Sequence, residues 1–477
     1  MEKFFYRFRS TDRLLDGSHE LEQQEIFFAS PKELNDPLDG FKDIVWRGDE
    51  ILWSNLLKHY MLCLMHTAIG PYISPDHIFA DSECFIFANQ GTFPTPEFGM
   101  LYDKICQMFF QHEDIANLPA LLASRNSSIR RDELTTYLRM VHLHALNAVL
   151  TGMEEANCSP VRPKDDPVRA ASLKPIPCCE ILNKWSLLER DNPDKPGIVE
   201  VLTASAEGVA MQFNLISEYN GTSLRYVTAW KFVVSEFTRK YVEELEQLLY
   251  RECHTACFVE DHTQAAMWGN YGDGHKGICL KFKASSNSSG APSLKLNQIC
   301  GCRGDKSGST PVYGDVAHEF CKVEYVPQFI EIDFFCSLGR LTGPMLRYWF
   351  YDSAGNASYS VQGILSESDR WREQYWKQFD RAITTKLKDW AHENEFRLTY
   401  ITDSTDPPAR KLKYNFEDLQ GIIFGIKTST TDKLKIMHII ENKCRKEGRK
   451  DFEFHQAYYS RLKGKIETTK LSLLKFA

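Results

Sequence analysis

Short stretches at both ends of the chain carry the alternation of apolar and polar residues that half-buried strands show. Strands are predicted for "KFFYRFRS" and "EIFFAS" near the N-terminus, and for "ACFVE", "ICLKF" and "LQGIIFGI" after residue 255. Between residues 46 and 250 the apolar residues instead recur every three or four positions, as in "DELTTYLRMVHLHALNAVL", which predicts helices. No internal repeat of fixed period is evident.

This pattern predicts an α+β fold with a mixed, mostly antiparallel sheet. Residues 1–45 are expected to form the first part of the core and residues 251–477 the remainder, with 46–250 as a mainly helical insertion or added module. Residues 284–311 are rich in Ser and Gly and are expected to form a low-complexity surface loop.

Residues 391–400, "AHENEFRLTY", carry charged side chains at every second position. Because successive side chains of a strand point to opposite faces, Glu393, Glu395 and Arg397 would share one face. That face is either an exposed surface with a weak ion pair or one wall of a cleft. In a cleft, one carboxylate can stabilise positive charge while the other accepts a proton, and Arg397 can bind a phosphate. The preceding residues 379–390, "FDRAITTKLKDW", predict an amphipathic helix that leads into this strand.

The segment 267–277, "MWGNYGDGHKG", places two aromatic residues three positions apart beside a glycine-rich turn. Trp268 and Tyr271 would lie on one helical face, and His275 falls in the turn, from which its side chain can reach a cleft. One interpretation is that the rings stack on a flat ligand such as nicotinamide or adenine, while His275 or Tyr271 holds a ribose or phosphate oxygen. The other is that the rings pack in the core beside a structural turn.

The segment "NDPLDG" supplies three further polar side chains, those of Asn35, Asp36 and Asp39. Asn and Asp hydrogen-bond nearby backbone amides, so a structural role in a turn is the first interpretation. Alternatively, the turn forms the floor of a pocket, where its side chains meet a sugar hydroxyl or a cation.

Composition and charge narrow the class of protein. With 43% hydrophobic and 25% charged residues among 477, the chain is expected to be globular, with two or three domains. A net charge of −7 argues against general attraction to nucleic acid or to an anionic membrane. Lys58, His59 and His66 interrupt the most apolar stretch, which is therefore expected to be a buried helix and not a membrane span.

The fourteen cysteines show no small-scaffold spacing, and "MEKFFYRFRS" lacks an apolar region followed by a cleavage site. We therefore expect a cytoplasmic location with reduced thiols. No paired C-x-x-C pattern occurs, so no metal site is expected. P-loop, dinucleotide and G-x-S-x-G motifs are also missing. The segment from Lys433 onward carries twelve Lys or Arg against five Asp or Glu, which indicates a solvated face or a contact with nucleic acid or phosphate.

Five segments form an ordered set along the chain: "FFYRFRS", "IFFASPKELNDPLD", "CFVEDHTQAAMWGNYGDGHKGICLKF", "WAHENEFRL" and "LQGIIFGIK". Taken in order, they resemble the successive signatures of a widespread bacterial family catalogued as domain of unknown function 2971. The resemblance covers about residues 1–45, 250–285 and 315–477, and the helical block is longer than expected for that family. It implies no settled activity.

The order of elements more distantly resembles the ADP-ribosyltransferase fold, in which a basic residue on the first strand, a middle Tyr or Ser and a late Glu surround NAD. By position, the resemblance implies that Arg7 binds the diphosphate or ribose of NAD and that Tyr271 stacks on nicotinamide. Glu395, or Glu393 two residues before it, would hydrogen-bond the nicotinamide ribose and stabilise an oxocarbenium-like transition state. The remaining candidates for binding NAD are Trp268, His275, Arg397, Asn35 and Asp36.

The leading hypothesis is an NAD-consuming enzyme, either an ADP-ribosyltransferase or an NAD glycohydrolase, that serves as a bacterial toxin or phage-defence effector. Its expected partners are a protein or nucleic-acid acceptor and a regulatory protein, with no membrane. One alternative is a non-enzymatic module that binds protein or nucleic acid, and another is a metal-dependent nuclease that uses Asp36, Asp39 and the glutamates. The transferase requires Arg7, Tyr271 and Glu395 to converge on one cleft, whereas the binding module predicts that they scatter.

Overall fold

The computed structural model of the protein contains two compact units. Unit 1 consists of Met1–Phe41, Glu252–Phe329 and Asp380–Ala477, and unit 2 of Lys42–Arg251 and Ile330–Phe379. The structure describes residues 2–73, 84–173, 177–195, 197–220, 228–305, 308–366, 368–402 and 406–473.

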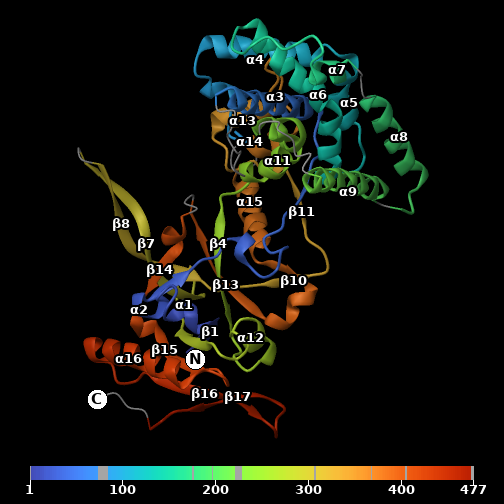
Figure 1. Ribbon diagram of the computed structural model, residues 1–477. Helices are drawn as coiled ribbons and strands as arrows, with labels where there is room; N and C mark the ends of the chain where they lie inside the picture. Colours follow the sequence, from blue (N-terminus) through green and yellow to red (C-terminus); the bar gives the residue numbers. More distant parts are fainter. Residues whose placement is uncertain are drawn as a thin grey trace. The chain divides into compact units, whose positions relative to one another are not determined.

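Unit 1 is built around an open sheet of eight strands in the order β17-β16-β15-β5-β1-β4-β13-β9 (Figure 1). Neighbouring strands run antiparallel, except for the parallel pair β15 and β16. The expected mixed structure with a mostly antiparallel sheet is therefore confirmed. The strands are β1 (Phe4–Arg9), β4 (Cys253–Val259), β5 (Ile278–Lys283), β9 (Cys321–Lys322), β13 (Glu395–Ile401), β15 (Leu419–Phe424), β16 (Glu453–Ser460) and β17 (Lys465–Lys470).

A second sheet has the order β2-β14-β7-β6, with β8 paired to β7. The expectation of a loop at 284–311 is wrong, because β7 and β8 form a long antiparallel hairpin there. Leu294 and Leu296 alternate with polar residues and are buried, so this strand has one core-facing side that the Ser- and Gly-rich composition conceals. The strands are β2 (Glu25–Phe27), β6 (Ser285–Ser286), β7 (Pro292–Asp305), β8 (Gly308–Glu319) and β14 (Lys411–Tyr414).

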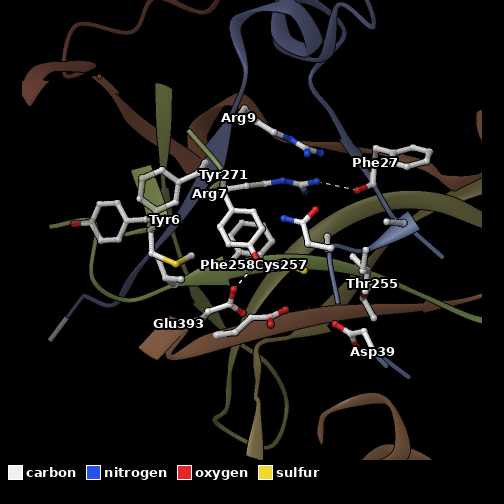
Figure 2. A pocket seen from close by; sticks show the side chains of 18 of the residues that line it. Tyr6, Arg7, Arg9, Phe27, Asp39, Thr255, Cys257, Phe258, Tyr271 and Glu393 are labelled. Carbon is white, nitrogen blue, oxygen red and sulfur yellow. Dashed lines mark hydrogen bonds between the residues drawn. The ribbon is translucent and has the colours of Figure 1, made fainter. Parts of the chain in front are cut away.

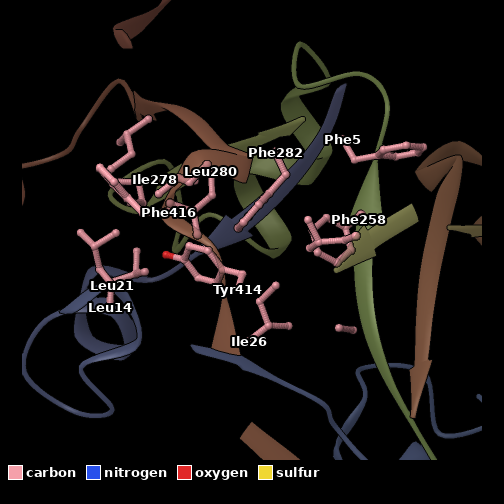
Figure 3. Packing of buried hydrophobic residues seen from close by; sticks show 14 of the residues in the cluster. Phe5, Leu14, Leu21, Ile26, Phe258, Ile278, Leu280, Phe282, Tyr414 and Phe416 are labelled. Atoms are coloured by element: carbon pink, nitrogen blue, oxygen red, sulfur yellow. The ribbon is translucent and has the colours of Figure 1, made fainter. Parts of the chain in front are cut away.

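The hydrophobic core of unit 1 joins one face of the large sheet to the second sheet and to α16 (Thr430–Glu447). Phe258 and Phe282 of the large sheet face Ile26 and Tyr414 of the second one (Figure 3). The rings of Phe282 and Tyr414 meet edge to face at 5.1 Å. The short helices of this unit are α1 (Thr11–Leu14), α2 (Glu20–Gln23) and α12 (Ala265–Asn270).

The helix predicted at 379–390 is wrong in its second half. α15 (Ser368–Ile383) ends early, and β12 (Thr385–Leu387) then pairs in parallel with β10 (Glu324–Val326). Ile383, Thr384 and Thr385 are branched at Cβ, which favours an extended chain over a helix. A 3₁₀ turn over Lys388–Glu393 leads into β13.

Unit 2 is largely helical. Parallel pairing of β3 (Asp43–Val45) with β11 (Glu331–Asp333) helps to join Ile330–Phe379 to this unit, although the sequence placed that segment in the α+β core. None of the helices in the described ranges is long and apolar enough to cross a membrane. The helices are α3 (Glu50–Ile73), α4 (Pro96–Phe110), α5 (Glu113–Ala123), α6 (Arg131–Glu155), α7 (Pro167–Ser172), α8 (Cys178–Asp191), α9 (Ile198–Tyr219), α10 (Thr228–Lys231), α11 (Phe237–Glu244), α13 (Gly343–Phe350) and α14 (Ser360–Ser366).

Candidate active site

A cavity opens in unit 1 where β1 and β4 separate. These strands are in register at one pair, Tyr6 with Val259, whereas β1 and β5 pair at six positions. The cavity has a volume of about 160 Å³. Its walls come from β1, β4, the end of α12, the segment before β13 and the turn around residues 33–39 (Figure 2). Polar and aromatic side chains from distant parts of the sequence therefore meet in one place.

One side of the cavity holds a buried cluster of charges. Nζ of Lys386 lies 2.7 Å from Glu395, 2.8 Å from Glu393 and 3.4 Å from Asp39. Arg397 donates to both oxygens of Asp39 at 2.7 Å and to those of Glu395 at 2.9 and 3.2 Å. Each of the five side chains is at most 5% exposed. Three carboxylates thus share two cations, which leaves the cluster with one formal negative charge when all are ionised.

The geometry of β13 explains how its charged residues reach this cluster. Glu395 is opposite Val259 and Arg397 opposite Cys257 in the register with β4, so both side chains project from the same face of the strand. Asn394 has a left-handed backbone with a φ of 47°, which turns the chain between the 3₁₀ segment and β13. Glu393 precedes this turn and nevertheless reaches the same lysine as Glu395.

The charges within the cluster set its ionisation. Burial alone would raise the pKa of Glu395, but the positive charges of Arg397 and Lys386 outweigh it and lower that pKa to about 2. Burial opposes the charge of Lys386, yet the nearby carboxylates, Glu395 first among them, raise its pKa above the ordinary value. The Tyr271 hydroxyl donates to Glu393 at 2.5 Å, and burial together with this carboxylate raises the pKa of Tyr271. At neutral pH the cavity therefore presents an ionised Glu395 and a protonated tyrosine.

The other side of the cavity is formed by arginines of β1 (Figure 2). Arg7 is 4% exposed, and its Nη2 donates to the carbonyl of Phe27 at 2.8 Å. Nη1 of Arg7 and Nη2 of Arg9 are buried without a hydrogen-bond partner among the described residues. Arg9 is paired with Glu20 at 2.9 Å. Burial, with a smaller contribution from Arg9, lowers the pKa of Arg7 to about 9, and the charge of Glu20 offsets only part of this lowering.

These features equip the arginine side to bind an anion. A buried donor without a partner loses the hydrogen bonds that water would give it, and an anionic ligand would restore them. Arg7 and Glu395 are separated by β4, so their backbones lie at least two strand spacings, about 10 Å, apart. The cavity can therefore hold one end of a ligand at the arginines and the other at the carboxylates.

The structure brings most of the candidate residues from the sequence to this cavity. Arg7, Tyr271, Glu393 and Glu395 line it, and so does Asn35. The requirement that the first-strand arginine, the middle tyrosine and the late glutamate converge on one cleft is met.

Four other candidates do not line the cavity. Trp268 is fully buried, donates through Nε1 to the carbonyl of His262 at 2.8 Å and packs edge-on against Phe8. His275 lies in a left-handed turn with a φ of 70°, its ring stacked parallel to that of Trp268. Arg397 does not line the cavity, but it donates hydrogen bonds to Asp39 and Glu395, which do. Asp36 accepts from the backbone N–H of Leu38 at 2.9 Å, the hydrogen bond of a turn.

Lys386 and Arg9 are not among the site residues predicted from the sequence. Lys386 lies in a segment expected to be helical, and its sequence neighbourhood does not show that it meets Asp39, a carboxylate from a distant segment, as well as Glu393 and Glu395. Arg9 had a usable signal, because it follows Arg7 by two positions on a predicted strand and so shares its face. Asp39 was noted as a turn residue, and in the structure it is the partner that neutralises Arg397 from a remote part of the chain.

The arrangement of this charge cluster does not favour binding of a metal ion. Its carboxylates are already paired with Lys386 and Arg397, whose positive charges oppose the binding of a metal cation between them. Across the part of the chain that the structure describes, no group of three or more His, Cys, Asp or Glu side chains could hold a metal ion.

Comparison with known proteins finds a family model that matches part of the chain. Residues 267–398 match the family model described as "Protein of unknown function (DUF2971)". No curated protein and no solved structure matches the chain. The matched stretch includes Tyr271, Lys386, Glu393 and Glu395, whereas Arg7 lies outside it. The contacts of Lys386 with Glu393 and Glu395 thus fall within the matched stretch, whereas Asp39 of the same cluster lies outside it.

Proposed function

We propose that the cavity is the active site of an NAD-consuming enzyme of the ADP-ribosyltransferase type, or of an NAD glycohydrolase. The observation that carries the proposal is the opposition of charge across one cavity. Figure 2 shows Arg7 and Arg9 on one side and Glu393 on the other. Glu395 also lines the cavity and shares Lys386 with Glu393. NAD has the matching distribution, because its diphosphate is anionic and its nicotinamide–ribose end is cationic.

The arginine side would bind the diphosphate. Guanidinium groups form bidentate, charge-assisted hydrogen bonds with phosphate oxygens, and the free nitrogens of Arg7 and Arg9 provide donors for them. Tyr6, Phe258 and Tyr271 form an aromatic wall of the same cavity, against which the nicotinamide ring would lie. The diphosphate would anchor the substrate, so that binding energy far from the reacting bond positions the ribose.

The carboxylate side would carry the chemistry. The bond between C1′ of the ribose and the nicotinamide nitrogen breaks, and its electron pair leaves with nicotinamide, which departs as a neutral molecule. The ribose is left with positive charge, which an ionised carboxylate stabilises in a site that excludes water. Water or an acceptor nucleophile then forms the new bond to C1′ and gives its proton to a carboxylate or to solvent. The low pKa of Glu395 supports this role, since the group stays charged at neutral pH.

The two glutamates differ in their surroundings. Both oxygens of Glu395 are held by Arg397, and one also by Lys386. Glu393 binds Lys386 with one oxygen and accepts from Tyr271 with the other, which places it beside the aromatic wall. We assign charge stabilisation to this pair, and single substitutions distinguish the two members.

The proposed setting is a bacterial cytoplasm, where the enzyme would act as a toxin or phage-defence effector on a protein or nucleic-acid acceptor under control of a regulatory partner. Family resemblance, and no particular residue, supports this part of the proposal. The convergence of Arg7, Tyr271 and Glu395 on one cavity favours an enzyme over a binding module, and the pairing of its carboxylates with Lys386 and Arg397 disfavours a metal-dependent nuclease.

Release of nicotinamide from NAD tests the proposal. The full chain is incubated with NAD, candidate acceptors and a cell lysate as a source of the regulatory partner, and nicotinamide is measured by chromatography. Glu393→Gln and Glu395→Gln keep the side-chain shape but remove the charge, and loss of the catalytic carboxylate is expected to slow release roughly 100- to 1,000-fold. Glu453→Gln is the matched control, because Glu453 is also ion-paired, with a pKa lowered to about 2, but does not line the cavity.

The outcome separates the hypotheses. Release by the wild type and the control, with loss in at least one of the two cavity variants, supports the proposal, provided that thermal melting shows all variants to be folded. If NAD stays intact with the wild type, or if both variants match it in rate, the proposal fails. Metal-dependent cleavage of RNA or DNA would support the nuclease instead.

A further inference from the structure

A second surface, unrelated to the cavity, lies on α9 of unit 2. Six large apolar residues, each between 43% and 90% exposed, follow one side of this helix: Val201, Leu202, Val209, Phe213, Ile216 and Tyr219. Successive members of this set are one, seven, four, three and three positions apart, which keeps their side chains on one side of the helix. These six residues are called the stripe below. A surface helix normally turns such a stripe toward the core, and a continuous exposed apolar patch marks an interaction site.

Apart from Val199, the buried residues of α9 are polar, and their contacts anchor the helix with its apolar stripe outward. Glu207 is 8% exposed and forms an ion pair with Arg139 of α6. Thr203 is fully buried, and Asn214 donates to Glu236 at 2.7 Å. Rotating the helix to bury the apolar stripe would expose these partners and break the ion pair, which is costly for buried charges.

The charges of α9 limit what can cover the stripe. The residues between its apolar members on the same side are uncharged: Ser205, Gly208 and Gln212. α9 contains Glu but no Lys or Arg. Helices that lie on anionic membranes are rich in Lys and Arg, and so are surfaces that bind nucleic acid, so α9 fits neither partner. The stripe instead fits an uncharged, apolar surface of a protein.

We propose that the stripe binds the same stripe of a second copy of this chain, with the two helices antiparallel. The six side chains expose on the order of 700 Å² per chain, close to the roughly 800 Å² per partner of a standard protein–protein interface. An isologous contact needs a surface that complements itself. The stripe meets this condition, because antiparallel packing sets its bulky C-terminal end, Phe213 to Tyr219, against its smaller N-terminal end, Val201 and Leu202.

The middle of the stripe fixes the proposed symmetry axis. Val209 is the member nearest to its midpoint, and Ser205 and Gly208 beside it are small enough for two helices to approach closely. In an antiparallel pair, a residue at the axis meets its own copy. Two like charges introduced at Val209 would therefore repel one another, and opposite charges on the two chains would attract.

Sedimentation velocity of the full chain across a wide range of concentrations tests this interface. The wild type is expected to sediment as a dimer, whereas Val209→Glu and Val209→Lys alone are expected to associate at least tenfold more weakly. Mixing these two variants is expected to restore the dimer. The matched control is Val161→Glu, at a residue of unit 2 that is 77% exposed and is not part of α9, and it is expected to stay dimeric.

Three results would overturn the proposal: the wild type is monomeric at every concentration, the Val209→Glu variant still dimerises, or the mixture of Val209→Glu and Val209→Lys remains monomeric. Binding of the wild type to anionic lipid vesicles that Val209→Glu abolishes would assign the stripe to a membrane and also overturn it. The restored dimer in the mixture requires both variants to be folded, so misfolding cannot imitate the expected outcome.

Discussion

Replacing Lys386 by Met removes the cation that the three carboxylates of the cavity share. Its Nζ contacts Glu395, Glu393 and Asp39 within 3.4 Å, and the side chain is 5% exposed. After Lys386→Met, Arg397 alone would face three buried carboxylates. Removing one partner from a buried ion pair destabilises a protein by roughly 3–5 kcal/mol, since it leaves an uncompensated buried charge. We expect a loss of this size for unit 1 at pH 7.

The loss should depend on pH in a definite direction. The pKa of Glu395 is lowered from 4.5 to about 2 in the folded protein. This difference corresponds to about 3 kcal/mol of stability, which is present above pH 4.5 and is lost as the pH falls toward 2. Because Lys386 provides part of that lowering, its removal should cost most above pH 4.5 and progressively less below it. A second substitution, Glu395→Gln in the Lys386→Met background, should recover part of the loss.

Hydrogen exchange in increasing urea, followed by mass spectrometry of peptides from β4 and β13, measures the stability of unit 1 separately from that of unit 2. Lys470→Met is the matched control, because Lys470 pairs with Glu453 at 2.6 Å but is 54% exposed. An exposed pair of this kind is expected to contribute less than about 1 kcal/mol. If Lys386→Met costs no more than Lys470→Met, or if its cost rises as the pH falls, the account of the charge cluster is refuted.

Three further predictions follow from single residues. Arg7→Met should weaken binding of ADP-ribose at least tenfold by calorimetry. It should leave the melting temperature of the free protein unchanged or higher, because it removes a buried cation whose Nη1 has no hydrogen-bond partner among the described residues. A melting temperature several degrees lower would make Arg7 structural. Burial raises the pKa of Asp418 from 3.8 to about 6, so the native state loses stability as the pH rises from 3.8 to 6. Asp418→Asn should therefore increase the free energy of unfolding by about 1 kcal/mol at pH 7.5 and leave it unchanged near pH 4, as measured by urea unfolding. Gly277→Ala should cost more than about 2 kcal/mol, since its Cβ would press on the carbonyl oxygen of Arg9, whereas Gly269→Ala, which meets open space, should be tolerated.

The parts of the fold that could be predicted are those with a clean local pattern. β1, β4, β5, β13 and β15 alternate or are continuously apolar, and the long helices of unit 2 repeat every three or four residues. β12 was missed because it is three residues long and is stabilised by its pairing with β10, a partner remote in sequence. The hairpin of β7 and β8 was missed because its Ser and Gly content resembles that of a loop, while two buried leucines fix its orientation.

The residues of the candidate site likewise divide into those that a local sequence pattern predicts and those that only the tertiary structure brings together. Alternation along β13 was enough to place Glu395 and Arg397 on one face, and the first-strand position was enough to single out Arg7. Whether an aromatic residue lines a cavity or packs behind it depends on the tertiary arrangement, so Trp268 and Tyr271 could not be told apart by spacing. Lys386 and Asp39 meet through contacts between segments far apart along the chain, and such contacts leave no local signal.

The most direct test of the central claim is the position of the bond that the protein breaks in NAD. The full chain is incubated with NAD in water enriched in ¹⁸O, with a lysate as a source of the regulatory partner, and the products are analysed by mass spectrometry. The account predicts free nicotinamide together with either ADP-ribose that carries one ¹⁸O at C1′, if water is the acceptor, or ADP-ribose bound to an acceptor. These products should be lost in Glu393→Gln, in Glu395→Gln or in both. Incorporation of ¹⁸O at a phosphate, or intact NAD with the wild type, would contradict it.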